Sequence, residues 1–105
     1  MTLTQFEYLT ALDDHRHFSL AAEACFVTQP TLSMQIQKLE EELGVKIFDR
    51  TKQPVIPTEI GAGIIAQARI VLREANQVKQ LIDEQKDTLS GELRLGIIPT
   101  LAPYV

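Results

Sequence analysis

The sequence predicts a mainly α-helical protein, and three observations support this fold class. Two short helical patterns separated by a tight turn occupy residues 19–40, a polar and basic hairpin follows at residues 45–57, and an apolar heptad pattern runs through residues 64–82. We therefore expect a winged helix-turn-helix over residues 1–58, a long dimerising linker helix over residues 59–90, and the first strand of a truncated α/β domain over residues 91–105.

Composition limits the kind of protein that this chain can be. Its 105 residues, 45% of them apolar and 23% charged, suffice for one modest domain plus an extension. No apolar run reaches the roughly eighteen residues of a membrane span, and the acidic N-terminal segment does not resemble a signal peptide. A single cysteine, Cys25, excludes an intrachain disulfide. We expect a cytoplasmic protein.

Capping residues mark where the first three helices begin. Two overlapping capping boxes, Thr2 with Gln5 and Thr4 with Glu7, predict a helix from about Leu3 to near His15. Ser19 and Thr28 each precede a helical pattern, where a hydroxyl can accept a hydrogen bond from an unpaired N–H. Pro30 falls in the first turn of the third helix, where its missing N–H costs nothing.

The third helix, residues 31–43, has two unlike faces. Its apolar residues form one stripe that must be buried: Leu32, Ile36, Leu39 and Leu43. The remaining surface mixes hydroxyls, amides, one methionine and one cation: Pro30, Thr31, Ser33, Met34, Gln37 and Lys38. Such groups can donate to phosphates and read base edges in the major groove of DNA. The competing interpretation is an ordinary solvated face.

The net charge of −4 argues against a nucleic-acid partner, because non-specific affinity for DNA comes from neutralising phosphates. The distribution of charge weakens this objection. Residues 28–39 contain Lys38 and no acid, while the acids gather in residues 13–14 and 40–42, where we expect them to point away from a duplex. The pattern favours a specific binder with modest non-specific affinity.

A short hairpin should follow Gly44, which is a natural C-cap for the third helix. Residues 45–48 and 55–56 alternate as short strands, and the polar, basic segment between them, residues 49–54, is here called the wing. Beside a duplex the wing would reach a flanking backbone or the minor groove. Its competing interpretation is an exposed turn.

A long helix is predicted to begin after Thr58 and to continue to about Thr88. Its apolar positions step by four and three residues and form a dimerisation seam: Ile64, Ala68, Val71, Ala75, Val78 and Ile82, with Leu72 in a second row beside Ile65 and Leu81. Leu89–Gly91 should end the helix, and Leu93, Leu95 and Ile97 alternate as a strand. A strand cannot stand alone, so we expect a longer natural protein.

No constellation of residues predicts a catalytic, metal or cofactor site, and we expect no enzyme. His15, His17 and Cys25 are too few for a closed zinc site, and no third group orients a nucleophile. Cys25 is expected to be a small core residue. Gly61-Ala62-Gly63 lacks the third glycine and the preceding strand of a dinucleotide loop, so close packing better explains Gly61.

The order of these motifs closely resembles the DNA-binding part of LysR-type transcriptional regulators over nearly the whole chain. The residues that carry the resemblance are Thr28–Ser33, Gln35-Ile36, Lys38–Glu40, Leu43-Gly44, Phe48, Arg50, Thr58 and Gly61. His15–Phe18 and Gly96–Tyr104 also look like the OxyR branch, the peroxide-responsive activators of the oxidative stress response.

The resemblance implies a winged helix-turn-helix, a homodimer through linker helices, a tetramer when the protein is full length, and RNA polymerase as a further partner. It suggests contacts to operator DNA from Thr28, Gln29, Pro30, Thr31, Ser33, Met34, Gln37 and Lys38, and from Arg50, Thr51, Lys52 and Gln53 at the wing. Many members have Arg in place of Met34, and an arginine can form two hydrogen bonds to one guanine. Met34 cannot, so we expect it to contact a thymine methyl or to pack on a sugar instead. The peroxide-reactive cysteines of that branch lie in the regulatory domain.

Two functional classes remain open at this point. The first is sequence-specific transcriptional regulation through dimeric binding to a partly palindromic operator. The alternative is a dimerising protein-interaction module without DNA binding, which the acidic net charge keeps in consideration. Salt dependence separates them, because binding to phosphates weakens steeply as ionic strength rises.

Overall fold

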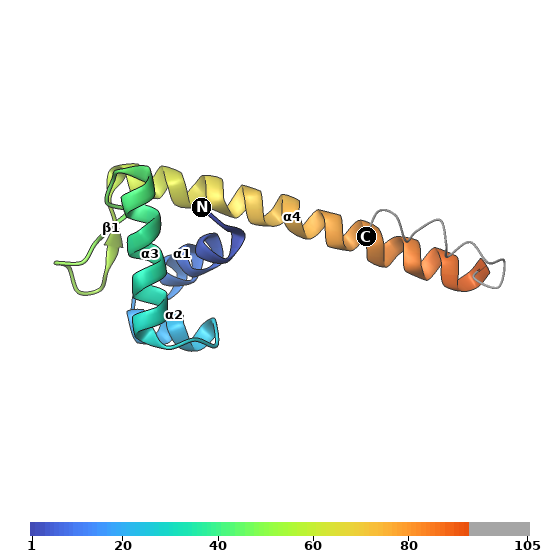
Figure 1. Cartoon of the computed structure of the whole chain (residues 1–105), viewed down its shortest axis with the longest axis horizontal. Coiled ribbons are helices and arrows are strands. Elements are labelled where there is room, and N and C mark those ends of the chain that lie inside the picture. Colours follow the sequence, from blue (N-terminus) through green and yellow to red (C-terminus); the bar gives the residue numbers. More distant parts are fainter. Residues whose placement is uncertain (93–105) are drawn as a thin grey trace. The chain divides into compact units, whose positions relative to one another are not determined.

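The computed structural model describes residues 1–92, which form four helices and a two-stranded antiparallel sheet. In chain order these are α1 (Leu3–His15), α2 (Phe18–Ala24), α3 (Gln29–Leu43), β1 (Phe48–Asp49), β2 (Ile56–Pro57) and α4 (Glu59–Glu92) (Figure 1). The chain divides into two compact units, Met1–Leu72 and Arg73–Val105. The first unit contains the winged helix-turn-helix that the sequence predicts, together with the first part of α4.

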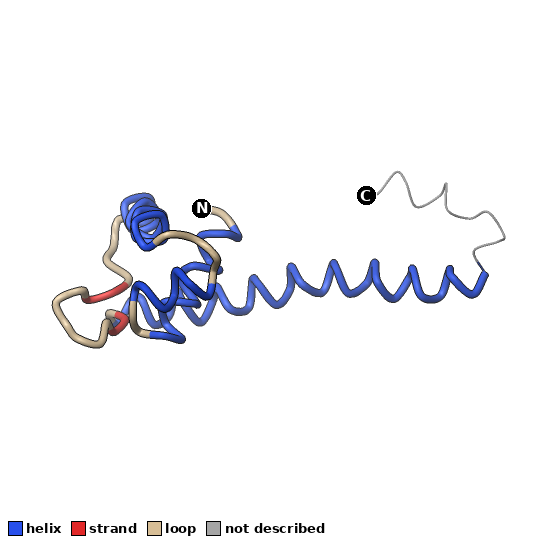
Figure 2. Tube along the Cα trace, turned by 90° about the horizontal axis from the view of Figure 1, so that it is seen from below, coloured by secondary structure: helices blue, strands red, loops and turns tan. Residues whose placement is uncertain are grey.

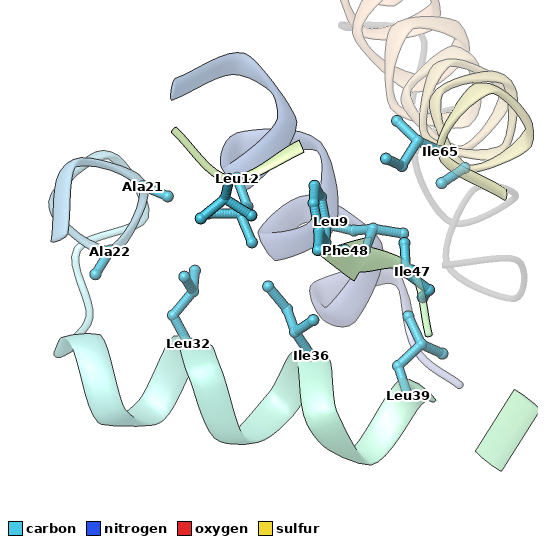
Figure 3. Close-up of a cluster of buried hydrophobic side chains, with 12 residues drawn as sticks. Leu9, Leu12, Ala21, Ala22, Leu32, Ile36, Leu39, Ile47, Phe48 and Ile65 are labelled. Carbon is cyan, nitrogen blue, oxygen red and sulfur yellow. The ribbon is translucent and has the colours of Figure 1, made fainter. Parts of the chain in front are cut away.

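One apolar core holds the first unit together. Its buried members are Leu9 and Leu12 of α1, Ala21 and Ala22 of α2, Leu32, Ile36 and Leu39 of α3, Ile47, Phe48 and Val55 of the hairpin, and Ile65 and Ala68 of α4. Figure 3 shows the three α3 side chains pointing toward α1, α2 and Phe48. Burial of each Leu or Ile contributes about 1.5–3 kcal/mol, so this face of α3 is firmly committed to the core.

The predicted caps of α1 and α3 are confirmed. Gln5 N donates to Thr2 Oγ1 at 3.1 Å and Thr2 N donates to Gln5 Oε1 at 3.0 Å, which completes the capping box. Thr31 N donates to Thr28 Oγ1 at 3.3 Å, and Pro30 lies in the first turn of α3.

Two other predicted caps are wrong. α2 begins at Phe18, with His17 at the N-cap position, so Ser19 lies inside the helix and its Oγ is 2.9 Å from His17 Nδ1. The helix begins earlier because Phe18 packs against the core as its first residue. Thr4 lies inside α1, where only the Thr2 box can form.

The apolar stripe of α3 is buried as predicted at Leu32, Ile36 and Leu39, but not at Leu43, which is 36% exposed. Leu43 is the last residue of α3, and a helix end is covered from fewer sides than its middle. Glu40 is buried in its place and is only 3% exposed. Of the acids in residues 40–42, Glu40 therefore faces the interior of the protein.

The hairpin is present, but its strands are shifted relative to the prediction. Phe48 pairs with Pro57 and Asp49 with Ile56, whereas the sequence predicts strands at residues 45–48 and 55–56. The shift has a cause in the hydrogen bonds of Ile47. Its carbonyl accepts from Thr58 N at 2.9 Å, in register with the two strand pairs, but its N–H donates to the Glu40 carboxylate at 2.8 Å and is not available to the ladder.

The wing projects from the helices in both the ribbon and the tube views, and Figure 2 shows α3 nearly end-on beside it. A backbone hydrogen bond from Val55 N to Arg16 O, 3.2 Å long, joins the far end of the wing to the turn between α1 and α2. The wing thus emerges from a base that is attached to the helical core.

α4 begins after Thr58, as predicted, with Gly61 N donating to Thr58 Oγ1 at 3.0 Å. The prediction that Leu89–Gly91 ends this helix is wrong, because α4 continues through Glu92. Glycine inside a helix costs only about 1 kcal/mol relative to alanine, so Gly91 does not compel a helix end. The strand predicted at Leu93, Leu95 and Ile97 lies outside the described residues.

Candidate nucleic-acid interface

Over residues 28–38, the side of α3 opposite the core carries no acidic residue, and we call this surface the outer face of α3. It consists of Thr28, Gln29, Pro30, Thr31, Ser33, Met34, Gln37 and Lys38. All are exposed except Thr31 and Ser33, which are half-buried, and Met34 is 48% exposed. Figure 3 shows Leu32, Ile36 and Leu39 pointing inward. Helical periodicity therefore directs residues on the opposite side of α3 away from the core.

The start of α3 is well ordered by its own side chains. Thr28 Oγ1 accepts from Thr31 N and also donates to Thr31 Oγ1 at 2.8 Å. Pro30 has no N–H and Thr31 N is used by the Thr28 cap, so the contribution of this turn to a ligand is mainly the positive end of the helix dipole. This end of the outer face is therefore electrostatically suited to an anionic ligand.

The wing is shaped by Asp49. Its Oδ1 accepts from Thr51 N at 3.0 Å and from Thr51 Oγ1 at 2.5 Å. The hydrogen bonds from the Thr51 side chain and backbone, with a smaller contribution from the Lys52 charge, lower the pKa of the Asp49 carboxyl. Thr51 is exposed, but its hydroxyl is used by Asp49. Lys52 and Gln53 are exposed as well, and their side chains make no hydrogen bond within residues 1–92.

Arg50 lies at the wing but its guanidinium turns toward the protein. Nη2 donates to Glu40 Oε1 at 3.1 Å, and Cζ lies 5.4 Å from the centroid of the Phe18 ring. Nε is buried without a hydrogen-bond partner among the described residues. The structure therefore places Arg50 differently from the other residues that sequence reasoning assigned to the wing.

A shallow depression of about 120 Å³ brings the start of α3 and the wing together. Gln29 and Gln53 both line it, although they lie far apart in the sequence. The other lining residues are Arg16, His17, Phe18, Ser19 and Val55. Sequence reasoning assigned no contact role to Arg16, His17 or Ser19. Their polar character was visible, but their nearness to the wing depends on the tertiary fold.

The predicted seam of α4 is divided between two environments. Ile65 and Ala68 are buried in the core of this chain, and Ile64 packs against that core. Val71, Leu72 and Ala75 are half-buried, whereas Val78, Leu81 and Ile82 are 63%, 60% and 37% exposed. Among the predicted seam positions, the exposed apolar side chains therefore lie in the later part of the seam.

The residues considered as zinc ligands or as parts of a nucleophilic site lie at helix ends. His15 and His17 are exposed, and Cys25 is half-buried at the C-cap of α2. Burial, and to a smaller extent the charge of Glu7, raises the pKa of the Cys25 thiol, which lowers its thiolate fraction at neutral pH. Within residues 1–92 no three His, Cys, Asp or Glu side chains are grouped so that they could hold a metal ion.

In the same part of the chain, no helix combines the length and the apolar character needed to cross a bilayer.

Comparison with known proteins identifies a family that matches the residues of this surface. Residues 3–62, from α1 to the start of α4, match the family described as bacterial regulatory helix-turn-helix protein, lysR family. A hydrogen peroxide-inducible genes activator from Pectobacterium carotovorum subsp. carotovorum is 50% identical over 105 residues, which is 100% of this chain and 35% of the relative.

Solved structures agree with this match. Full-length OxyR from Pseudomonas aeruginosa, carrying a cysteine substitution, has a TM-score of 0.78 at 49% identity, over 82% of this chain and 29% of that one. A complex of the BenM DNA-binding domain with catB site 1 DNA has a TM-score of 0.77 at 33% identity, over 80% of this chain and 94% of that one. The chain spans about a third of the length of the peroxide-inducible relatives, with 35% of the first covered.

Proposed function

The chain belongs to the LysR family of bacterial helix-turn-helix regulators, and on that premise we propose that it is the DNA-binding part of a transcriptional regulator. It would bind a partly palindromic operator as a homodimer. The observation that carries the proposal is the outer face of α3, which is mostly exposed, free of acids over residues 28–38 and adjacent to a basic wing, although the whole chain has a net charge of −4.

The side chains of the outer face suit the edges of DNA bases. Gln29, Ser33 and Gln37 can donate and accept hydrogen bonds in the major groove. Lys38 and, at the wing, Lys52 supply the charge that phosphates require. Met34 offers a flexible apolar group, suited to a thymine methyl. Division of labour between base readers and phosphate binders is the usual arrangement in protein–DNA interfaces.

The exposed end of the α4 seam supports a dimer. Val78 and Ile82 keep apolar surface in solvent, and pairing with the same helix of a second chain would bury it. A dimer with two copies of α3 spaced by one turn of DNA would match an operator with two half-sites. We also propose a tetramer and contact with RNA polymerase for the longer protein, as the family resemblance implies.

We propose a peroxide response for the longer protein, since a relative that is 50% identical over the whole chain is named for peroxide induction. The sensor would lie in the two-thirds of the relatives that this chain does not span. Cys25 is a poor candidate, because burial raises the pKa of its thiol. A bacterial regulator of this kind works in the cytoplasm, where the chromosome lies.

Selection from random duplexes tests the proposal. The 105-residue chain would be incubated with a library of random-sequence duplexes, and the affinity of the selected sequence would be compared with that of a scrambled one. We expect preference for the selected duplex at every salt concentration. Binding should also weaken steeply between about 50 and 200 mM KCl, because phosphate contacts release counterions.

Failure to enrich any duplex, even at low salt, would contradict DNA binding. Capture of a protein partner by the same helices under those conditions would instead support the interaction module that the acidic net charge suggests.

A further inference from the structure

Glu40 is a buried carboxylate on α3 that faces the wing and not solvent. It is 3% exposed, and its Oε2 accepts from Ile47 N at 2.8 Å and from Phe48 N at 3.3 Å. Its other oxygen, Oε1, accepts from Arg50 Nη2. The Glu40 side chain of α3 thus holds two parts of the hairpin: the backbone of residues 47–48, which leads into the wing, and the side chain of Arg50.

Arg50 completes this attachment from the other side. Its guanidinium pairs with Glu40 at 3.1 Å and stacks over Phe18 at the start of α2. Its side chain is 33% exposed, against 2% for that of Glu40, so the carboxylate is withdrawn from water while the guanidinium is partly accessible. Removal of one partner from a buried ion pair destabilises the folded protein, because the remaining charge is left buried without compensation.

The same backbone segment is held by α4. Thr58 N donates to Ile47 O at 2.9 Å, and Thr58 Oγ1 donates to Lys46 O at 2.6 Å. Residues 46–48 are therefore fixed between α3 and the start of α4. Only the tip of the wing, beyond Arg50, is free to meet a ligand.

We propose that Glu40 and Arg50 are positioning residues that fix the wing on α3, so that both meet DNA as one preorganised unit. Arg50 then acts within the protein and does not contact phosphate. This inference rests on the proposed function. Its energetic basis is that a loop already ordered before binding loses less conformational entropy on the duplex.

The variant Glu40→Gln separates this role from a direct contact. It leaves an oxygen that can accept from the backbone of the wing but removes the charge that holds Arg50. The net charge changes by one, from −4 to −3. If Arg50 bound phosphate, its release and the less acidic protein would strengthen DNA binding. If Glu40 positions the wing, binding to the selected duplex should weaken by about tenfold.

A double-mutant cycle with Lys52→Ala distinguishes positioning from general loss of stability. Lys52 is exposed at the wing, outside the Glu40–Arg50 pair. In the parent, Lys52→Ala should weaken binding several-fold. In the Glu40→Gln background it should have little further effect, because a displaced wing has no contact left to lose. A variant that is merely less stable would keep the full Lys52 effect at temperatures well below its Tm.

Thermal melts would establish that each variant is folded at the assay temperature, and Arg50→Lys provides a second test if Glu40→Gln does not fold. Lysine keeps the charge but cannot both pair with Glu40 and stack on Phe18, so it should weaken binding as well. Unchanged or tighter binding by these variants, with the parent binding normally, would overturn the positioning role and leave DNA binding intact. A parent that binds no duplex would instead contradict the proposed function itself.

Discussion

At Gly61 the lack of a side chain allows α4 to begin directly against the backbone of residue 47. A Cβ built on Gly61 would lie 1.9 Å from Ile47 O, far inside van der Waals contact. Two residues later, a Cβ on Gly63 would meet nothing within 4 Å. The close packing that the sequence predicted for Gly61 is therefore confirmed, and it has a specific partner.

These two glycines form a matched pair for mutagenesis. Gly61→Ala should lower the free energy of unfolding by about 1–3 kcal/mol, the usual cost of overpacking, because the obstructing atom belongs to the backbone. Gly63→Ala should raise it by up to about 1 kcal/mol, because alanine favours a helix. Thermal unfolding followed by circular dichroism measures both. Equal melting temperatures for the two variants would contradict the close contact of α4 with Ile47.

At the scale of the element, α3 carries packing and recognition on opposite faces. Leu32, Ile36 and Leu39 commit one face to the core, and this fixes the direction in which the outer face points. The wing differs, since its tip contributes cationic and amide groups without a buried stripe of its own. The two elements should therefore contribute to DNA binding in different ways, α3 through sequence preference and the wing through charge.

Two alanine variants compare these contributions. Ser33→Ala should reduce the preference for the selected operator by about 0.5–1.5 kcal/mol, as loss of a single hydrogen bond to a base does, with little effect on scrambled duplexes. Lys52→Ala should weaken all duplexes alike and reduce the salt slope by about one. Affinities for both duplexes over a range of salt concentrations give the answer. Equal losses on every duplex from Ser33→Ala would remove Ser33 from base readout.

At the scale of the whole molecule, the chain has two compact units, and α4 contributes residues to each. The early part of the predicted seam, with Ile65 and Ala68, is used by the core of the first unit. The exposed apolar side chains of α4 further along, Val78, Leu81 and Ile82, are the surface available to another chain. If the chain dimerises through α4 as proposed, dimerisation and folding depend on separate sections of one helix.

This separation allows the dimer to be tested without disturbing the core. Val78→Asp places a charge on a seam position that is 63% exposed, so it should give monomers in sedimentation velocity while the thermal stability of the first unit is retained. Gln80→Asp adds the same charge away from the seam and serves as the control. Operator affinity should fall with the dimer in the first variant only. A dimer that survives Val78→Asp would place the interface elsewhere.

Local signals in the sequence predicted much of this fold. The Thr2 and Thr28 caps, the buried stripe of α3 and the close packing of Gly61 each depend on neighbours within a few residues or on helical periodicity. Such signals also predicted the outer face of α3, because the residues opposite a buried stripe must point away from the core. The family resemblance drawn from these motifs agrees with the match over residues 3–62.

Only the tertiary structure decided the roles of Glu40 and Arg50. In the sequence, Glu40 belongs to a run of three acids and Arg50 to a basic turn, and both patterns are typical of solvated surface. In the fold, Ile47 N, Phe48 N and the Arg50 guanidinium converge on the Glu40 carboxylate. Burial of a charge depends on partners that come close only when the chain folds, so no local pattern could have predicted it.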